Sequence, residues 1–440
     1  MKKQTEFNEP YQNVIDLQEE KLRKQVQYVY NHSPFYREKF EQLSLTPGDI
    51  TCIEDLEKLS FTYKDEIRES QRVQGPLGRH AAVSLEDVIR VHSSSGTTGR
   101  PTYVGITRHD YDVWTEILAR VLYTHGIRKD SRIVFAMGLS FFVGSSMKDG
   151  IERLGATFIP IGTGASDRVI QSIQDFNADV LFCTPSYASY LAEYVRQNYD
   201  FEPSDLGLEI ISVGGEPGGG LPEVRNKIQQ DWGAKVVEAM GNADMAPVLF
   251  SECQEREGMH FVASDYVICE IIDPETGKVV PQSDHMEGEL VYTAIDRECS
   301  PLLRFRTRDL VQVDTRPCKC GRKSFRLKCV GRTDDMLIIR GVNVFPSAIK
   351  DVINSFRPRT NGEMSIILEE KPPLVHPPLS IKVEHEPDLK ENELTVLKKE
   401  IEGVLRSKLT FTSDVQLVPK GSLPRFEMKA KLIQQVDQLK

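Results

Sequence analysis

The spacing of apolar residues changes along the chain and predicts several kinds of region. Between residues 15 and 43, apolar side chains recur at helical spacing among many charged and amide residues, which predicts one or two amphipathic helices. From about residue 110, short apolar runs alternate with helix-length segments, an order typical of βαβ units and a largely parallel sheet. The runs expected to form strands are 132–137, 156–161, 180–184, 209–213 and 235–239.

After residue 260 the helix-length segments disappear, and β-rich runs such as 266–272 and 288–293 predict a smaller antiparallel sheet or barrel. Beyond Gly331 the pattern changes again and predicts a compact α+β domain. Its expected elements are a hairpin around Gly341, a helix over 346–356, strands near 364–369 and 379–384, a helix over 389–407 and a last strand at 415–418.

The predicted fold class is therefore a large α/β N-terminal domain, with parallel sheets and a smaller β subdomain, followed by a small α+β C-terminal domain. The expected bounds are residues 1–333 for the first domain and residues 334–440 for the second. The length of 440 residues supports this division, because a single hydrophobic core seldom keeps growing beyond about 250–300 residues.

The overall charge narrows the range of partners. With 55 Lys and Arg against 65 Asp and Glu, the formal net charge is −10, which argues against nucleic acid. Residues 1–16 lack the apolar stretch of a secretory signal, and no later apolar run is long enough to cross a bilayer. We therefore expect no membrane partner and a cytoplasmic location, with the eight cysteines present as reduced thiols or metal ligands.

Residues 91–102 carry the strongest candidate chemistry. Their sequence, VHSSSGTTGRPT, combines glycines, hydroxyl side chains and an arginine, and such a loop can bring N–H and hydroxyl donors to phosphate oxygens. The spacing differs from that of the Walker loop, and a single glycine-rich loop is more often a flexible turn. The residues expected to hold phosphates are Ser93, Ser94, Ser95, Gly96, Thr97, Thr98 and Gly99.

Other motifs favour a phosphate-binding loop over a flexible turn, because they occur in the order found in one family. The loop resembles the phosphate loop of adenylate-forming enzymes, the superfamily of acyl-CoA synthetases, luciferases and peptide-synthetase adenylation domains, and the chain resembles the phenylacetate-CoA ligase branch most closely. The matching segments are 33–37 (SPFYR), 152–157 (ERLGAT), 184–187 (TPSY), 214–217 (GGEP), 304–310 (RFRTRDL), 331–336 (GRTDDM) and 341–346 (GVNVFP).

The resemblance implies a two-step reaction. Members of this family use ATP to convert a carboxylate into an acyl-adenylate, and the thiol of CoA then displaces AMP. The resemblance implies that Asp309 accepts hydrogen bonds from the ribose hydroxyls and that Arg332 also approaches the ribose. The residues that match the loop beside the adenine are Gly214, Gly215, Glu216 and Pro217.

The C-terminal motifs resemble the parts of the family that change between the two steps. Lys429 matches the lysine that stabilises charge in the first step, and Met428 stands before it where relatives usually have glycine. Asp334 matches the hinge about which the small domain rotates, so this domain is expected to be mobile. Gly341 matches the position that leaves room for the pantetheine arm of CoA.

Two segments depart from the family pattern. Residues 239–244 read AMGNAD where relatives usually read Tyr-Gly-Leu-Ser-Glu, so Met240 is expected to pack on the adenine and Asp244 to ligate Mg²⁺. The acid-binding region, 138–150, carries Lys148 and Asp149 where an aromatic residue is common. Its two phenylalanines, at 141 and 142, are compatible with a core position and with an aryl pocket.

The thiols supply a separate prediction. Cys318 and Cys320 form a Cys-x-Cys pair, and Cys253 with His260 offers two more ligands of the kind that tetrahedral Zn²⁺ prefers. Some relatives with these residues hold a structural zinc, and the resemblance favours that role over four free side chains. Four protein ligands leave no open position on the metal, so such an ion would be structural.

Together these patterns predict an ATP-dependent ligase that joins an aromatic or arylacetic acid to CoA and requires ATP, Mg²⁺ and CoA. One alternative keeps adenylation but uses another acceptor, such as an amine, a carrier protein or a cofactor hydroxyl. Another is a nucleotide-binding protein that has lost catalysis. A homodimer is expected from the family resemblance alone.

Overall fold

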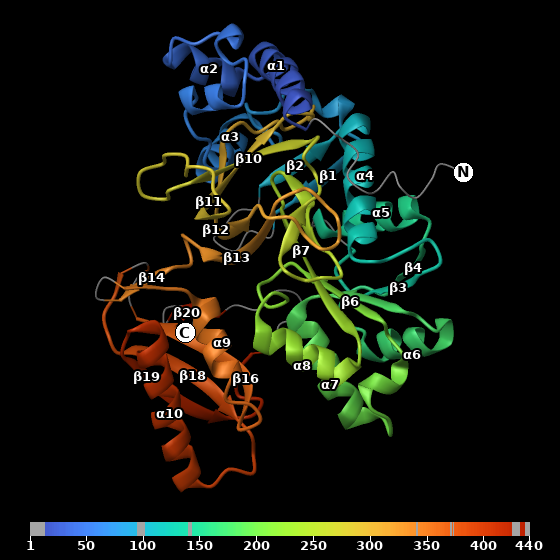
Figure 1. Ribbon diagram of the computed structural model, residues 1–440, viewed down its shortest axis with the longest axis vertical. Helices are drawn as coiled ribbons and strands as arrows, with labels where there is room; N and C mark the ends of the chain where they lie inside the picture. Colours follow the sequence, from blue (N-terminus) through green and yellow to red (C-terminus); the bar gives the residue numbers. More distant parts are fainter. Residues whose placement is uncertain are drawn as a thin grey trace. The chain divides into compact units, whose positions relative to one another are not determined.

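The computed structural model describes residues 14–94, 102–139, 143–339, 342–369, 372, 374–424 and 432–435 (Figure 1). Within them the chain forms two compact units. The first comprises Met1–Cys183, Leu208–Gly215 and Val237–Lys328, and the second comprises Thr184–Gly207, Glu216–Val236 and Cys329–Lys440. Two internal segments thus group with the C-terminal residues, and the domain boundary at 333/334 stays a prediction.

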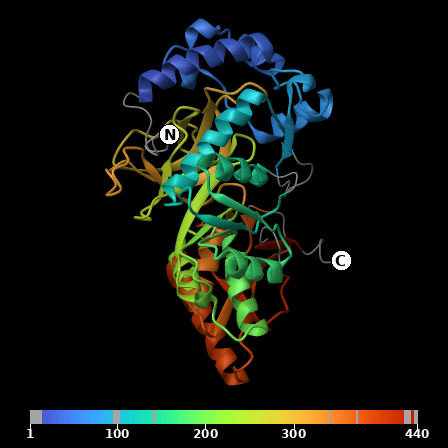
Figure 2. The same ribbon diagram turned by 90° about the vertical axis from the view of Figure 1, so that its right-hand side faces the viewer.

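The first unit begins with the amphipathic helices predicted for residues 15–43. They are α1 (Val14–His32) and α2 (Pro34–Gln42), which lie side by side in blue in Figures 1 and 2. Proline occupies the first position of α2, where its missing N–H costs no helical hydrogen bond. The buried faces of both helices share one core cluster, which includes Leu22, Val26 and Phe40.

The large sheet of the fold has eleven strands in the order β10-β11-β12-β13-β9-β8-β7-β6-β5-β3-β4. The predicted parallel strands are present, with β4, β3, β5 and β6 paired in parallel. Their bounds, with that of β7, are β3 Arg132–Phe135, β4 Thr157–Pro160, β5 Val180–Cys183, β6 Ile210–Gly214 and β7 Lys235–Asn242.

The antiparallel strands differ in one respect from the expectation, because they continue the same sheet instead of forming a separate one. Strand β8 pairs with β7 on one side and with β9 on the other, so it joins the two parts of the sheet and is not an edge strand. The antiparallel members are β8 Ala246–Glu252, β9 Met259–Phe261, β10 Val267–Ile272, β11 His285–Ala294, β12 Phe305–Asp314 and β13 Arg326–Arg332.

Helices and a short hairpin complete the first unit. Helix α4 buries Leu118, Val121 and Leu122 in a core cluster that also contains Phe135 of β3 and Phe182 of β5. The bounds are α3 Lys64–Gln74, β1 Arg90–Ser93, β2 Tyr103–Ile106, α4 Arg108–Thr124, α5 Met147–Leu154 and α6 Ser166–Phe176.

The second unit contains α7 (Pro185–Asn198) and α8 (Pro222–Trp232) together with the C-terminal α+β region. That region has the predicted elements and its own core, with Ile349 of α9 and Leu397 of α10 packed in one cluster with the strands. Its three-stranded sheet has the order β15-β14-β17, and its four-stranded sheet has the order β19-β18-β16-β20. The bounds are β14 Leu337–Ile339, β15 Val342–Val344, α9 Pro346–Asn354, β16 Thr360–Leu368, β17 Leu374–Val375, β18 Leu379–His385, α10 Glu391–Leu409, β19 Ser413–Pro419 and β20 Ile433–Gln435.

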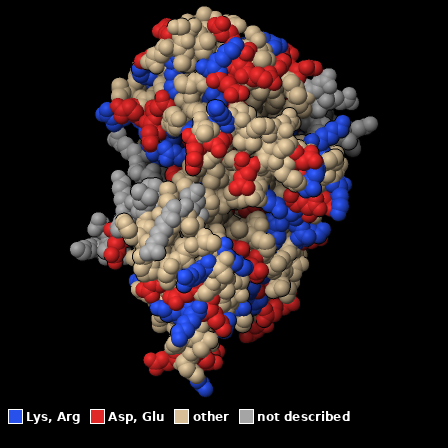
Figure 3. Space-filling model, turned by 60° about the vertical axis from the view of Figure 1, so that its left-hand side comes forward, with Lys and Arg blue, Asp and Glu red and all other residues tan. Residues whose placement is uncertain are grey.

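Acidic and basic side chains are interspersed over the face drawn in Figure 3, as the near balance of 55 Lys and Arg with 65 Asp and Glu leads one to expect. Among the helices in the described part of the chain, none has the combination of length and apolar character needed to cross a bilayer.

Candidate active site

The predicted phosphate loop is closed at its base by a hairpin. Strands β1 and β2 pair antiparallel with Ser93 opposite Tyr103. One residue further, the Ser94 N–H donates to the Thr102 carbonyl at 2.9 Å, and the Thr102 N–H donates to Ser94 Oγ at 3.1 Å. We call Ser93, Ser94, Thr102 and Tyr103 the neck of the loop. The other expected phosphate ligands, Ser95, Gly96, Thr97, Thr98 and Gly99, lie outside the described residues.

The neck is bonded to Asp244, the residue expected to ligate magnesium. The Thr102 hydroxyl donates to Asp244 Oδ1 at 2.6 Å, and the Lys64 ammonium lies 2.7 Å from Asp244 Oδ2. Asp244 is only 4% exposed. A carboxylate this buried needs charged or hydrogen-bonding partners on its oxygens, and here Thr102 and Lys64 supply one for each.

A tight turn between β7 and β8 fixes Asp244 in this position. Asn242 Oδ1 accepts the Asp244 N–H at 3.0 Å, and the Asn242 carbonyl accepts the Met245 N–H at 2.9 Å. Just before the turn, a Cβ on Gly241 would lie 2.0 Å from the Pro247 carbonyl oxygen, so only glycine fits. Arg297 completes the support, since its Nη1 donates to the carbonyls of Asp244 and Met245 at 2.7 and 2.6 Å.

Lys64 reaches Asp244 because the segment before it is hydrogen-bonded to the start of β12. The Thr62 N–H donates to the Arg304 carbonyl at 2.9 Å, and the Arg306 N–H donates to the Thr62 carbonyl at 3.0 Å. The Thr62 hydroxyl adds a bond of 2.7 Å to the Leu303 carbonyl. Residues separated by some 240 positions in the sequence therefore hold the first residue of α3 beside the neck.

Asp309, the expected ribose acceptor, is part of an irregularity in β12. Glu289 pairs with Leu310 while Val291 pairs with Arg306, so three residues of β12 stand opposite one of β11. Arg308, in the middle, has φ of 65°. Bulges of this kind redirect side chains, and the Asp309 N–H turns back to donate to Thr307 Oγ1 at 3.0 Å. Asp309 is 6% exposed.

The adenine-loop candidates have a structural reason for their glycines. A Cβ on Gly214, at the end of β6, would lie 2.9 Å from the Ala239 carbonyl oxygen, and Gly215 has φ of 86°. Within the second unit, Glu216 Oε1 accepts the Ser186 N–H at 2.8 Å at the start of α7, and Pro217 follows it. Met240 of β7 packs on the hydrophobic core.

The hinge candidates form an ion pair with each other. Arg332 Nε and Nη2 donate to Asp334 Oδ1 and Oδ2 at 2.8 and 3.0 Å, a two-bond arrangement between half-exposed side chains. Lys429 and Gly341 lie outside the described residues.

The region expected to bind the acid contains an ion pair with one buried partner, where the family resemblance leads one to expect an aromatic side chain. Asp149 of α5 is 4% exposed, and its Oδ2 lies 2.5 Å from Arg90 Nη1 of β1. The Tyr111 hydroxyl donates to its Oδ1 at 3.3 Å, and Lys148 Nζ lies 3.4 Å from the same oxygen. The phenylalanines at 141 and 142 lie outside the described residues.

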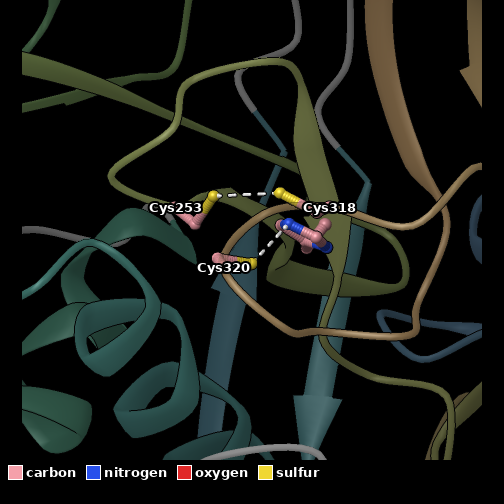
Figure 4. Close-up of side chains that lie close together, drawn as sticks. Cys253, Cys318 and Cys320 are labelled. Atoms are coloured by element: carbon pink, nitrogen blue, oxygen red, sulfur yellow. Dashed lines mark hydrogen bonds between the residues drawn. The ribbon is translucent and has the colours of Figure 1, made fainter.

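The four candidate zinc ligands lie together in the first unit. They are Cys253, His260, Cys318 and Cys320, and their ligand atoms all lie within 4.8 Å of one another. Cys253 Sγ lies 3.8 Å from Cys318 Sγ, and Cys320 Sγ lies 3.4 Å from His260 Nε2 (Figure 4). Figure 4 shows the three labelled sulfurs turned toward a common centre, Cys253 from the loop after β8 and both Cys318 and Cys320 from the loop between β12 and β13. The four residues that the sequence singled out thus converge.

The protonation of this cluster follows from its burial. Loss of solvent, together with the charge of Arg322, lowers the pKa of His260 to about 4, so its ring is neutral near neutral pH. Burial raises the pKa of the Cys253 thiol to about 12. His260 Nδ1 lies 3.3 Å from the Ser324 carbonyl oxygen. If Nδ1 carries the proton it donates to that carbonyl, and the lone pair of Nε2 is directed at the cluster.

Comparison with known proteins identifies the family. Residues 20–294 match the model of the AMP-binding enzyme family, and residues 341–436 match that of the AMP-binding enzyme C-terminal domain. The chain belongs to the AMP-binding enzyme family. It is 35% identical over 436 residues to a phenylacetate-coenzyme A ligase of Thermus thermophilus, covering 95% of both chains, and 34% identical to that of Escherichia coli K12, covering 94% and 93%.

Solved structures agree with this assignment. A 2-hydroxyisobutyryl-CoA ligase in its postadenylation state superimposes with a TM-score of 0.90 at 30% identity, covering 99% of this chain and 92% of that one. The fold predicted from the sequence is therefore confirmed, and membership of the AMP-binding enzyme family makes the protein an adenylate-forming ligase of the acid–thiol class that uses ATP and CoA.

Sequence reasoning missed three residues of this site: Lys64, Thr102 as a partner of Asp244, and Arg297. Lys64 and Arg297 carry no local motif, and both reach Asp244 only through tertiary contacts. Thr102 could have been found, because it ends the loop motif and closes the hairpin.

Proposed function

We propose that this AMP-binding enzyme activates an aromatic or arylacetic acid as its acyl-adenylate and transfers the acyl group to the thiol of CoA. The observation that carries the proposal is the 35% identity to phenylacetate-coenzyme A ligase across 95% of both chains. Further support comes from the buried carboxylate of Asp244 bonded to the neck of the phosphate loop.

The proposed roles follow the chemistry of a reaction that gathers negative charge. The loop from Ser93 to Gly99 would bind phosphates through N–H and hydroxyl groups, and Lys429 would stabilise the charge that builds at the α-phosphate. Asp309 would accept hydrogen bonds from the ribose, which Arg332 would also approach. The residues proposed to border the adenine are Gly214, Gly215, Glu216 and Pro217.

The second step would need the C-terminal residues to change position. Asp334 is the proposed hinge, and its ion pair with Arg332 would have to rearrange as the lid moves. Gly341, without a side chain, would leave room for the pantetheine arm. A homodimer, proposed from family analogy, is measurable by light scattering.

Asp244 fits a magnesium site in its chemistry, since carboxylate and hydroxyl oxygens are the ligands that this hard cation prefers. The turn at Asn242 and the carbonyl contacts of Arg297 would hold the carboxylate still, and Thr102 would align its second oxygen. Bound there, the metal would neutralise charge on the triphosphate.

The cysteine cluster fits a structural zinc. A tetrahedron with Zn–S bonds of about 2.3 Å and Zn–N bonds of about 2.0–2.1 Å has S–S edges of about 3.8 Å and S–N edges of about 3.5 Å. The Cys253–Cys318 and Cys320–His260 distances of 3.8 and 3.4 Å match these edges. Zinc would join the loop after β8, strand β9 and the loop between β12 and β13.

Acid-dependent exchange of pyrophosphate into ATP tests the proposal. The panel includes phenylacetate, benzoate, aminobenzoates, aliphatic acids and 2-hydroxyisobutyrate, the last because of the structural similarity to 2-hydroxyisobutyryl-CoA ligase. We expect the strongest exchange with an aryl or arylacetic acid and AMP release that depends on CoA. Exchange with 2-hydroxyisobutyrate alone would replace the proposed substrate class, and AMP release with another acceptor would replace CoA.

Matched variants test the site assignment. Lys429→Ala is expected to abolish exchange while it still converts a supplied acyl-adenylate and CoA into thioester. Lys431→Ala, a change two positions away, is the control and should retain exchange. Full exchange in Lys429→Ala would contradict the role given to this lysine.

A further inference from the structure

Lys64 is a cation whose partner, Asp244, is bonded to the neck of the proposed phosphate loop, and the family resemblance assigns Lys64 no role. Its ammonium lies 2.7 Å from Asp244 Oδ2, with the lysine side chain 28% exposed and the aspartate side chain 4% exposed. One partner of this ion pair is therefore buried and the other can reach solvent. Oδ2 is also an oxygen that a divalent cation on Asp244 would take.

The carboxylate is the fixed member of the pair. Thr102 holds Oδ1, Asn242 holds the backbone N–H, and Arg297 holds the backbone carbonyl. Lys64 has four rotatable carbons between its backbone and its charge. A cation that binds Oδ2 would consequently displace the ammonium and leave the aspartate in place.

Charge around the pair opposes a metal that arrives alone. Arg297 is 1% exposed, and its Nε and Nη2 have no hydrogen-bond partner among the described residues. Lys64 contacts the Asp244 carboxylate and Arg297 contacts the Asp244 backbone carbonyl, so two positive side chains contact a residue with one negative charge. A divalent cation would add to an excess of positive charge, whereas a metal bound to a polyphosphate would bring the compensating negative charge with it.

We propose that Lys64 competes with divalent cations for Asp244 Oδ2 and so keeps the metal off this site until a nucleotide brings it. The inference rests on the proposed magnesium site and deepens it, because it specifies the order of binding. Lys64 acts as a positioning residue, and its effect is visible without any chemical turnover.

Manganese binding to the full chain, without nucleotide, acid or CoA, tests the inference. Mn²⁺ affinity is measured by calorimetry and electron paramagnetic resonance for the wild type, Lys64→Met, Lys64→Gln and Lys64→Arg. We expect Lys64→Met and Lys64→Gln to bind Mn²⁺ at least about tenfold more tightly than the wild type, and Lys64→Arg to remain as weak as the wild type. Lys64→Gln retains an amide donor for Oδ2 and guards against a failure of Lys64→Met to fold.

Two controls decide between a specific and a general effect. Lys21 pairs with Asp296 at 2.5 Å and is 24% exposed, so Lys21→Met removes a comparable ion pair elsewhere in the unit and should leave Mn²⁺ binding unchanged. Asp244→Asn in the Lys64→Gln background should abolish the gain. Equal Mn²⁺ affinity in the wild type and in folded Lys64→Met or Lys64→Gln would overturn the inference, and so would a gain that survives Asp244→Asn.

The outcome is separable from that of the proposed function. A protein without acid-dependent exchange but with tight Mn²⁺ binding in Lys64→Gln would refute the ligase activity and support the competition. A protein with normal acid-dependent exchange and no change in Mn²⁺ affinity in the Lys64 variants would support the ligase activity and refute the competition.

Discussion

Replacement of Thr102 by valine removes one hydroxyl from the neck of the phosphate loop. The Thr102 hydroxyl donates to Asp244 Oδ1 at 2.6 Å and lies 2.9 Å from Ser94 Oγ, and Thr102 is fully buried. Valine keeps the branched shape of threonine but supplies no donor. Asp244 would then retain Lys64 on one oxygen and lose its partner on the other.

The expected cost follows from the charge of the acceptor. A hydrogen bond to a charged group contributes about 1.5–3 kcal/mol, and each 1.4 kcal/mol corresponds to about a tenfold change in an equilibrium. Opening of the neck should therefore become about 10- to 100-fold more frequent in Thr102→Val. Thr102→Ser keeps the hydroxyl and loses one methyl group, which costs about 0.8 kcal/mol, or about fourfold.

Hydrogen exchange followed by mass spectrometry measures this opening directly. The amides of Ser94 and Thr102 are hydrogen-bonded across the neck, so peptides containing them report its local stability. We expect exchange about 10- to 100-fold faster in the valine variant and at most about fourfold faster in the serine variant, with no difference in peptides from α10. Equal protection of the neck in Thr102→Val and the wild type would refute the role given to the hydroxyl.

Three further predictions address other parts of the chain. Cys320→Ser should lower bound zinc from about one per chain to near zero by plasma mass spectrometry, whereas Cys329→Ser, which changes an exposed cysteine outside the cluster, should not. Equal zinc in both variants would contradict the proposed zinc site. Asp309→Asn should weaken ATP binding by about 10- to 100-fold in calorimetry, since it removes a charged acceptor, whereas Asp314→Asn at the end of the same strand should have little effect. Burial lowers the pKa of His125 from its usual 6.5 to about 4, so the unfolded state binds the proton first and the free energy of unfolding falls as pH drops from about 6.5 to 4. His125→Gln should remove about 1.4 kcal/mol per pH unit of this loss. An unchanged slope of thermal midpoint against pH in His125→Gln would contradict this role of His125.

Local patterns were sufficient to predict most of the elements. The parallel strands β3 and β5 are short apolar runs between helix-length segments, so their type and order followed from the pattern of apolar residues along the sequence. The helix α9 begins at a proline, which is a helix-start signal in the sequence. The cysteine and histidine cluster proposed to bind zinc was predicted for a similar reason, since cysteine and histidine at these positions are chemically distinctive.

Tertiary contacts were not predictable in this way. The continuity of the sheet depends on β8 pairing with both β7 and β9, which no local pattern specifies. Lys64 resembles any lysine at the start of a surface helix until Thr62 is known to pair with the start of β12. Three partners of Asp244, namely Lys64, Thr102 and Arg297, are likewise set by contacts over sequence distances of 53 to 180 residues, beyond the reach of any periodicity.

The bulge that contains Asp309 makes the proposed nucleotide site sensitive to the length of β12 as well as to its residue types. Phe305 and Val311 flank the bulge, and both face the core with at most 1% of their surface exposed. Because side chains alternate between the faces of a strand, deletion of one residue between them would turn one of the two toward the opposite face. Deletion of two residues would keep Phe305 and Val311 in the core but would remove the bulge that positions Asp309. We therefore expect the core to accept the insertion or deletion of two residues in this strand but not of one. A two-residue deletion would preserve the core packing and would still move Asp309, the proposed ribose acceptor, from its position.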